Sequence, residues 1–178
     1  MNKTATLRTI LALAGCASKP APPSWQPNAR GALDAFTDAY FKGSSGIAET
    51  EFARARSETA STGRPDLVAQ AELVRCAAQA ASLVYDGCPG FAALARDATP
   101  AQHAYAAYIG GRWSALDAAL LPEQHRPVVA SGTLASVEDP LARAVAAGAL
   151  FKAGRITPDD IDRALDNAST QGWRRPLL

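Results

Sequence analysis

Histidine, the side chain most often used in acid–base and metal chemistry, occurs only twice in this 178-residue chain. The two histidines, His103 and His125, are 22 positions apart and lack the i, i+4 spacing that places two metal ligands on one helical face. Glu123 lies close to His125 in sequence, but there is no GxSxG nucleophile motif and no phosphate-binding glycine motif. We therefore predict no catalytic residue, no metal site and no cofactor, with both histidines packed or solvated.

The first residues predict export and a lipid anchor. Residues 1–15 combine a basic start with TILALAG, an apolar segment too short to span a bilayer as a helix. The motif LAGC, Leu13 to Cys16, resembles the lipobox of bacterial lipoproteins. This resemblance implies that residues 1–15 are a signal peptide, that cleavage occurs before Cys16, and that Cys16 is acylated. The alternative is an ordinary cleaved signal with an incidental cysteine.

The residues after Cys16 predict where the anchored protein is held. In the lipoprotein family an Asp after the cysteine is associated with the inner membrane, whereas Ala17 and Ser18 follow here. The resemblance therefore implies the outer membrane and a domain facing the periplasm. Four prolines in residues 17–27 disfavour a regular helix, so we expect residues 16–27 to be a tether and residues 28–178 to be one domain.

Two further cysteines predict a structural disulfide. With Cys16 acylated, Cys76 and Cys88 remain as an even pair in an oxidising compartment. Their bond would close a loop of about thirteen residues and contribute roughly 3 kcal/mol. The alternative is two buried thiols.

Aromatic and arginine residues supply the binding candidates. Tyr105, Tyr108 and Trp113 cluster around one turn, and Trp173, Arg174 and Arg175 lie near the end of the sequence. Trp, Tyr and Arg are enriched in the energetic centres of protein interfaces. They also fill gaps in an alanine-rich core, which is the reading that we favour for the two tyrosines.

Composition favours an all-α fold. Apolar residues make up 48% of the chain, and alanine, the strongest helix former, supplies much of that share. The formal net charge is +1, and removing Lys3 and Arg8 with the leader changes it to about −1. This balance does not indicate a nucleic-acid partner or an acidic membrane surface.

Apolar spacing and capping residues predict a series of helices. Asp66 to Tyr85 carries two apolar stripes, which indicates contacts on two sides and a central position. Helix starts are predicted by Thr99-Pro100, Asp139-Pro140 and Thr157-Pro158, where a capping residue precedes proline. The expected helices are 28–43, 48–59, 66–85, 91–96, 101–110, 113–121, 141–153 and 158–170.

A weak internal repeat indicates helical hairpins. AYFKG (39–43), AYIGG (107–111) and LFKAG (150–154) would each end one helix before a second begins. Ala48, Phe52 and Ala55 resemble the second helix of tetratricopeptide repeats, although the spacing from Tyr40 is one residue short. We therefore expect either an α-hairpin stack of this kind or an irregular helical bundle.

The functional expectation follows from location. A lipid-anchored helical domain resembles the helper lipoproteins of envelope machines, such as pilotins and accessory subunits of outer-membrane assembly. This resemblance implies a non-enzymatic adaptor that binds an envelope protein, needs no cofactor and contacts the membrane through its lipid. The alternatives are a periplasmic enzyme using Glu123, His125 or His103, and a lipoprotein that binds a small ligand.

Overall fold

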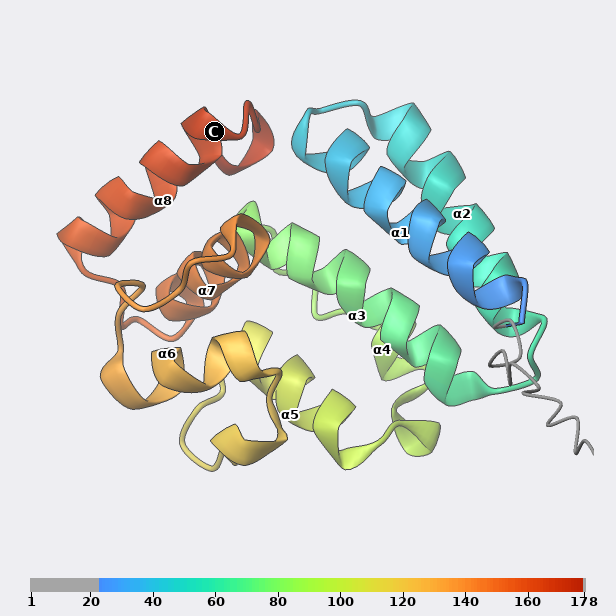
Figure 1. The fold of residues 1–178 in the computed structure, drawn as a ribbon. Coiled ribbons are helices and arrows are strands. Elements are labelled where there is room, and N and C mark those ends of the chain that lie inside the picture. The colour runs from blue at the N-terminus through green and yellow to red at the C-terminus, as the bar shows by residue number, and fades with distance from the viewer. Residues whose placement is uncertain (1–22, 178) are drawn as a thin grey trace, which may run out of the picture.

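Residues 23–177 are described by the computed structural model, and the regular elements in this range are all helices (Figure 1). The predicted all-α class is confirmed. The α-helices are α1 (Trp25–Phe41), α2 (Ser45–Ala60), α3 (Pro65–Ala81), α4 (Pro89–Ala92), α5 (Pro100–Ile109), α6 (Arg126–Ser131), α7 (Pro140–Lys152) and α8 (Pro158–Thr170). Short 3₁₀ helices are η1 (Ala95–Asp97), η2 (Ala118–Leu120), η3 (Glu123–His125) and η4 (Arg175–Leu177). The predicted signal peptide and Cys16 lie outside the described residues.

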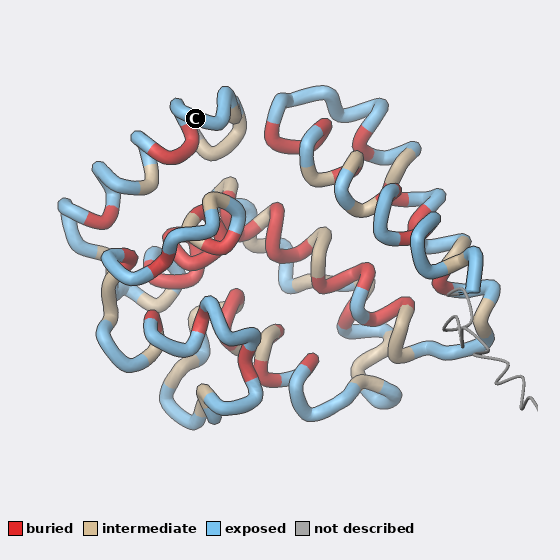
Figure 2. The backbone as a smooth tube through the Cα atoms, in the orientation of Figure 1, coloured by how far each residue is buried: buried red, intermediate tan, exposed pale blue. Residues whose placement is uncertain are grey.

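Helix α3 is central, as its two apolar stripes predict. It contacts the α1–α2 hairpin, α4, α5 and α7. Figure 2 shows buried residues along much of α3, whereas α8 is exposed over most of its length. The helices therefore form a bundle around α3 rather than a stack that grows in one direction.

Small residues let α7 approach α3 closely. A Cβ at Gly148 of α7 would collide with the backbone carbonyl of Ala80 in α3. Tyr85, just beyond α3, donates its hydroxyl hydrogen to the Gly148 carbonyl at 2.8 Å. The α3–α7 crossing is consequently a backbone contact that a larger residue at position 148 would push apart.

The three predicted helix starts are confirmed. The Thr99 hydroxyl accepts a hydrogen bond from the Gln102 N–H at 3.2 Å, and the Asp139 carboxylate accepts one from Ala142 at 2.7 Å. Thr157 caps α8 in the same way. Proline occupies the first helical position in each case, where its missing N–H costs nothing.

Buried Asp160 ties the start of α8 to the loop before α7. Its fully buried carboxylate accepts hydrogen bonds from the Thr133 hydroxyl and the Leu134 N–H, both at 2.8 Å, and from the hydroxyl and N–H of Thr157. Burial acts to raise the pKa of Asp160, but these hydrogen bonds outweigh it, and the pKa lies below its ordinary value.

The internal repeat corresponds to a shared way of ending a helix. Gly43, Gly111 and Gly154 have φ angles of +84°, +70° and +67°. At each end the residue after the glycine donates its N–H to the carbonyl five positions earlier, with N···O distances of 2.8–2.9 Å. This is the Schellman motif, in which glycine enters the left-handed region without steric cost.

The unit that contains Gly111 is not a helical hairpin. The predicted helix over 113–121 is wrong, because no α-helix forms there. Over residues 113–121 the chain forms turns and only the 3₁₀ helix η2. The Trp113 indole N–H binds the Tyr108 carbonyl at 2.8 Å, and the Asp117 carboxylate accepts from the Ala119 N–H at 2.9 Å. These local hydrogen bonds compete with a helical ladder.

Other boundaries also differ from the predictions. Helix α1 begins at Trp25, so the last three residues of the predicted tether are helical; Pro27 is tolerated because the first turn needs no N–H donor. Helix α3 ends at Ala81 rather than at Tyr85. The predicted helix 91–96 is divided between α4 and η1, and α6 was not predicted.

Candidate functional site

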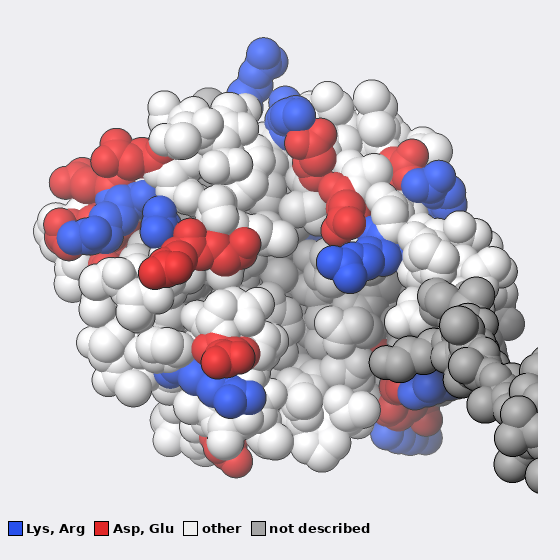
Figure 3. Space-filling view, in the orientation of Figure 1, with Lys and Arg blue, Asp and Glu red and all other residues white. Residues whose placement is uncertain are grey.

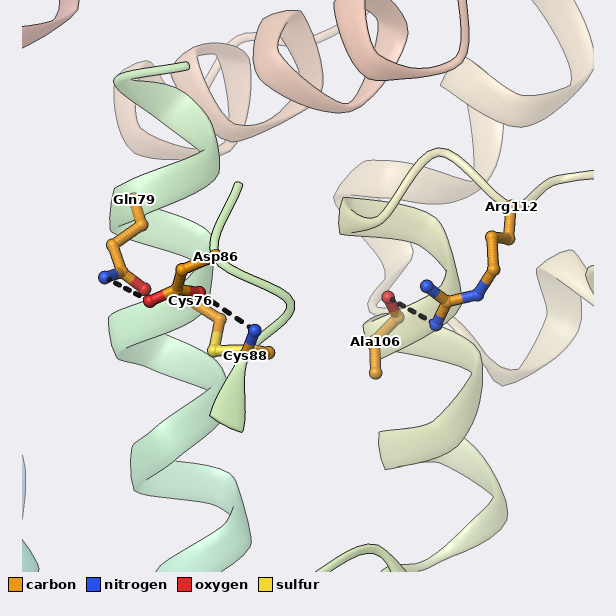
Figure 4. Close-up of a disulfide and its surroundings, with 6 residues drawn as sticks. All are labelled: Cys76, Gln79, Asp86, Cys88, Ala106 and Arg112. Atoms are coloured by element: carbon orange, nitrogen blue, oxygen red, sulfur yellow. Dashed lines mark hydrogen bonds between the residues drawn. A yellow bond between two sulfur atoms is a disulfide. The ribbon is translucent and has the colours of Figure 1, made fainter. Parts of the chain in front are cut away.

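The predicted cysteine pair lies at disulfide distance (Figure 4). Cys76 on α3 is joined to Cys88 in the loop before α4, with a Cα–Cα distance of 5.7 Å. Asp86 holds this loop by accepting from the Cys88 N–H at 2.9 Å and from the Gln79 side chain at 3.1 Å. The pair therefore fixes a loop that has little regular structure of its own.

A cleft of about 390 Å³ lies beside the disulfide. Arg112, drawn opposite the cysteines in Figure 4, donates to the Ala106 carbonyl at 3.5 Å. His103 also lines this cleft, is exposed, and packs edge-on against Phe91 at 5.9 Å.

Three of the predicted binding residues form an internal aromatic cluster with His125. Tyr108 has no exposed surface; its ring stacks on Trp113 at 5.3 Å and lies 4.9 Å from His125. Tyr105 packs against both Tyr108 and His125 and is half-buried. Burial raises the pKa of both tyrosines, so they remain neutral. This placement agrees with a packing role for the tyrosines.

The other predicted binding residues pack back onto the first hairpin. Trp173 lies 4.7 Å from Phe41, ring to ring, and the Arg174 N–H binds the Phe41 carbonyl at 2.8 Å. The Arg175 guanidinium lies 4.2 Å above the Tyr40 ring and donates to the Ser45 hydroxyl at 2.6 Å. Of these three residues, only the Arg174 side chain is exposed. We call this contact the 173–175 clasp.

The two histidines are not brought together. His125 is only 2% exposed and lies in the aromatic cluster, whereas His103 lies in the cleft beside the disulfide. Burial lowers the pKa of His125 to about 4, opposed by the charge of Asp139. Within residues 23–177 neither imidazole forms a hydrogen bond or ion pair with a carboxylate, and no three metal-ligating side chains gather. Glu123 is exposed.

An apolar groove between α7 and α8 was not predicted. Its volume is about 140 Å³, and α8 contributes Ile161 and Leu165 to it. Phe151 of α7 and Leu83 at the end of α3 complete its exposed part. The exposed fractions are 50% for Leu83, 48% for Phe151, 41% for Ile161 and 42% for Leu165. The spacing of Ile161, Ala164, Leu165 and Ala168 is a sequence signal for an apolar face, but it does not show that half of that face is left uncovered.

Leu83 has an unusual backbone in this groove. It lies two residues beyond the end of α3 with φ +58°, and the following residue, Val84, donates to the Gln79 carbonyl at 2.9 Å. This is the Schellman position that glycine occupies at the three repeat ends. A side chain there costs roughly 1–2 kcal/mol. The chain thus holds a strained leucine half exposed at the surface.

Charged side chains of both signs are interspersed over the face drawn in Figure 3. None of the helices in residues 23–177 combines the length and hydropathy needed to cross a membrane. Comparisons of the chain with protein-family models, curated proteins and solved structures give no match.

Proposed function

We propose that this chain is a lipoprotein anchored in the outer membrane through Cys16, facing the periplasm. There it acts as a non-enzymatic adaptor or assembly factor that binds an envelope protein. The lipobox-like LAGC motif supports the anchor. The α7–α8 groove supports the adaptor role and is the observation that carries it.

The size of the groove indicates the kind of partner. Four apolar side chains, each about half exposed, present roughly 350 Å² in total, within the range typical of functional patches. A stable dimer buries about 800 Å² on each partner, of which roughly 450 Å² is apolar, so the apolar surface of the groove is smaller than a dimer needs. A second copy of this chain is therefore a poor fit, and the proposed occupant is one amphipathic helix of another protein.

The sequence neighbour of Ile161, which does not itself line the groove, would favour a basic residue on that helix. Asp162 is exposed next to Ile161 and forms no ion pair within residues 23–177. A Lys or Arg beside the partner's apolar face would match this carboxylate and help to set the orientation of the helix.

Site-specific photo-cross-linking in cells that naturally produce the protein tests this proposal. A cross-linker at Ile161 should form one major adduct, mapping to a partner segment with apolar residues spaced i, i+3 and i+4. A cross-linker at Thr170, exposed on α8 but outside the groove lining, is the control.

A matched pair of variants separates the groove from general effects. Leu165→Asp should abolish the adduct, whereas Leu120→Asp should not, because Leu120 is 39% exposed but lies outside the groove. The proposal is overturned if Ile161 forms no adduct, if the adduct joins two copies of this chain, or if both variants behave alike.

A further inference from the structure

Two adjoining cavities meet at His125, away from the α7–α8 groove. The smaller, of about 110 Å³, lies among α3, α7 and η3 and is lined in part by Asp139 and Val145. The larger, of about 450 Å³, lies between α5 and the segment around η2 and is lined in part by Gln102. Both are lined by Val74, Tyr105, Gln124 and His125, so these four residues lie between the two spaces.

His125 has an unmet hydrogen-bonding group in this position. The residue is 98% buried, so its polar atoms need partners inside the protein. Its Nδ1 is fully buried but has no hydrogen-bond partner within residues 23–177. The neighbouring Tyr108 hydroxyl is also buried without a partner. A buried polar atom left unpaired costs about 1–3 kcal/mol, and a ligand recovers that energy at His125 only when the imidazole turns to bring Nδ1 to the surface of a cavity; Tyr108 lines neither cavity.

The charge of the linings determines which ligand fits. Neither lining contains a Lys or Arg, and Asp139 is their only carboxylate. Asp139 is itself exposed to solvent; one of its oxygens accepts from the Ala142 N–H, which leaves the other available. A carboxylate, a neutral imidazole and the Tyr105 ring are suited to a cation and unsuited to an anion.

We propose that the smaller cavity binds a primary ammonium group on a short aliphatic stem. The ammonium would lie between the Asp139 carboxylate and the Tyr105 ring and donate to a His125 ring nitrogen. The stem would contact Val74, Ala78 and Val145. A cavity of 150 Å³ holds benzene, so about 110 Å³ admits a group of roughly four or five heavy atoms. The site is independent of the proposed adaptor role.

Nuclear magnetic resonance of the imidazole groups in the full chain tests this inference. Titration with n-butylammonium should shift the His125 signals to saturation. His103 lies outside both linings and serves as an internal control whose signals should not move. 1-Butanol and butyrate, which share the stem but lack the cation, should bind at least 10-fold more weakly.

Two aspartate variants give a matched comparison. Asp139→Asn should weaken n-butylammonium binding about 10-fold without unfolding the domain, because Asn is an equally good helix cap. Asp117→Asn removes the same charge from another capping residue that lies outside both linings, and should leave the affinity unchanged.

The outcomes also identify the source of the ammonium. If Nα-acetyl-lysine amide binds as well as n-butylammonium, a lysine side chain is an acceptable ligand; if only n-butylammonium binds, the site takes a free small amine. The inference is overturned if no saturable shift occurs at His125, if butanol matches the amine, or if Asp139→Asn leaves the affinity unchanged.

Discussion

Replacing Leu83 tests whether the end of α3 is strained. In Leu83→Ala the new residue keeps a Cβ in the left-handed conformation at φ +58°, whereas in Leu83→Gly that steric cost disappears. Both variants lose the packing of a side chain that is half buried, worth about 1 kcal/mol. The difference between the two variants therefore isolates the backbone contribution.

We expect Leu83→Gly to be more stable than Leu83→Ala by about 1 kcal/mol, which corresponds to roughly 2–4 °C in Tm for a domain of this size. Urea unfolding of the oxidised protein measures the difference directly. At an ordinary helical position the order is reversed, so Ala60→Gly at the exposed end of α2 should cost up to about 1 kcal/mol.

An alanine variant at position 83 that is as stable as the glycine variant would refute the strain argument. Both variants remove an apolar side chain from the groove, so both should weaken cross-linking from Ile161 whatever their stability. That pattern would separate the binding role of Leu83 from its structural cost.

Two further predictions concern buried ionisable groups. His125 has a pKa of about 4 in the folded protein and about 6.5 when unfolded, so the unfolded chain binds more protons between these values. The free energy of unfolding should therefore fall by up to about 3 kcal/mol as pH drops from 6.5 to 4, and a profile equally steep in His125→Phe would contradict this assignment. In Asp160→Asn one carboxylate oxygen becomes an amide NH₂ group, which faces hydrogen-bond donors such as the Leu134 N–H and the Thr157 hydroxyl. This change should lower the free energy of unfolding, measured in urea, by about 2–4 kcal/mol. Asp159→Asn, exposed on the same turn, loses only a surface ion pair with Arg163 and should cost less than about 1 kcal/mol, and equal effects at the two positions would exclude a specific network.

Local signals in the sequence were sufficient for most helix ends. Helix starts are marked by a capping residue before proline, at Thr99, Asp139 and Thr157. Helix stops are marked by a glycine after a segment that contains an aromatic residue, at Gly43 and Gly154. The approach of Cys76 and Cys88 to disulfide distance was predictable from the even number of cysteines left after Cys16.

Features that depend on tertiary contacts were not predictable in the same way. The region 113–121 has helical spacing, but stacking of Trp113 on Tyr108 and its indole hydrogen bond draw it into turns. Leucine is not a helix-stop residue, so the left-handed turn at Leu83 that follows α3 carries no local signal. The burial of His125 depends on α5, η3 and α7 coming together, and the groove depends on which part of α8 is left uncovered.

The 173–175 clasp affects how the domain opens. Arg175 and Ser45 are 130 residues apart, and closing so long a loop by itself would cost about 4 kcal/mol of chain entropy. Two hydrogen bonds, one aromatic contact and one cation–π contact do not exceed that cost, so the clasp forms only after the bundle has brought its two sides together. Once closed, it couples the α1–α2 hairpin to α8, two elements that otherwise meet through α3 and α7. Amide hydrogens in the first hairpin and the last helix should consequently exchange as one cooperative unit.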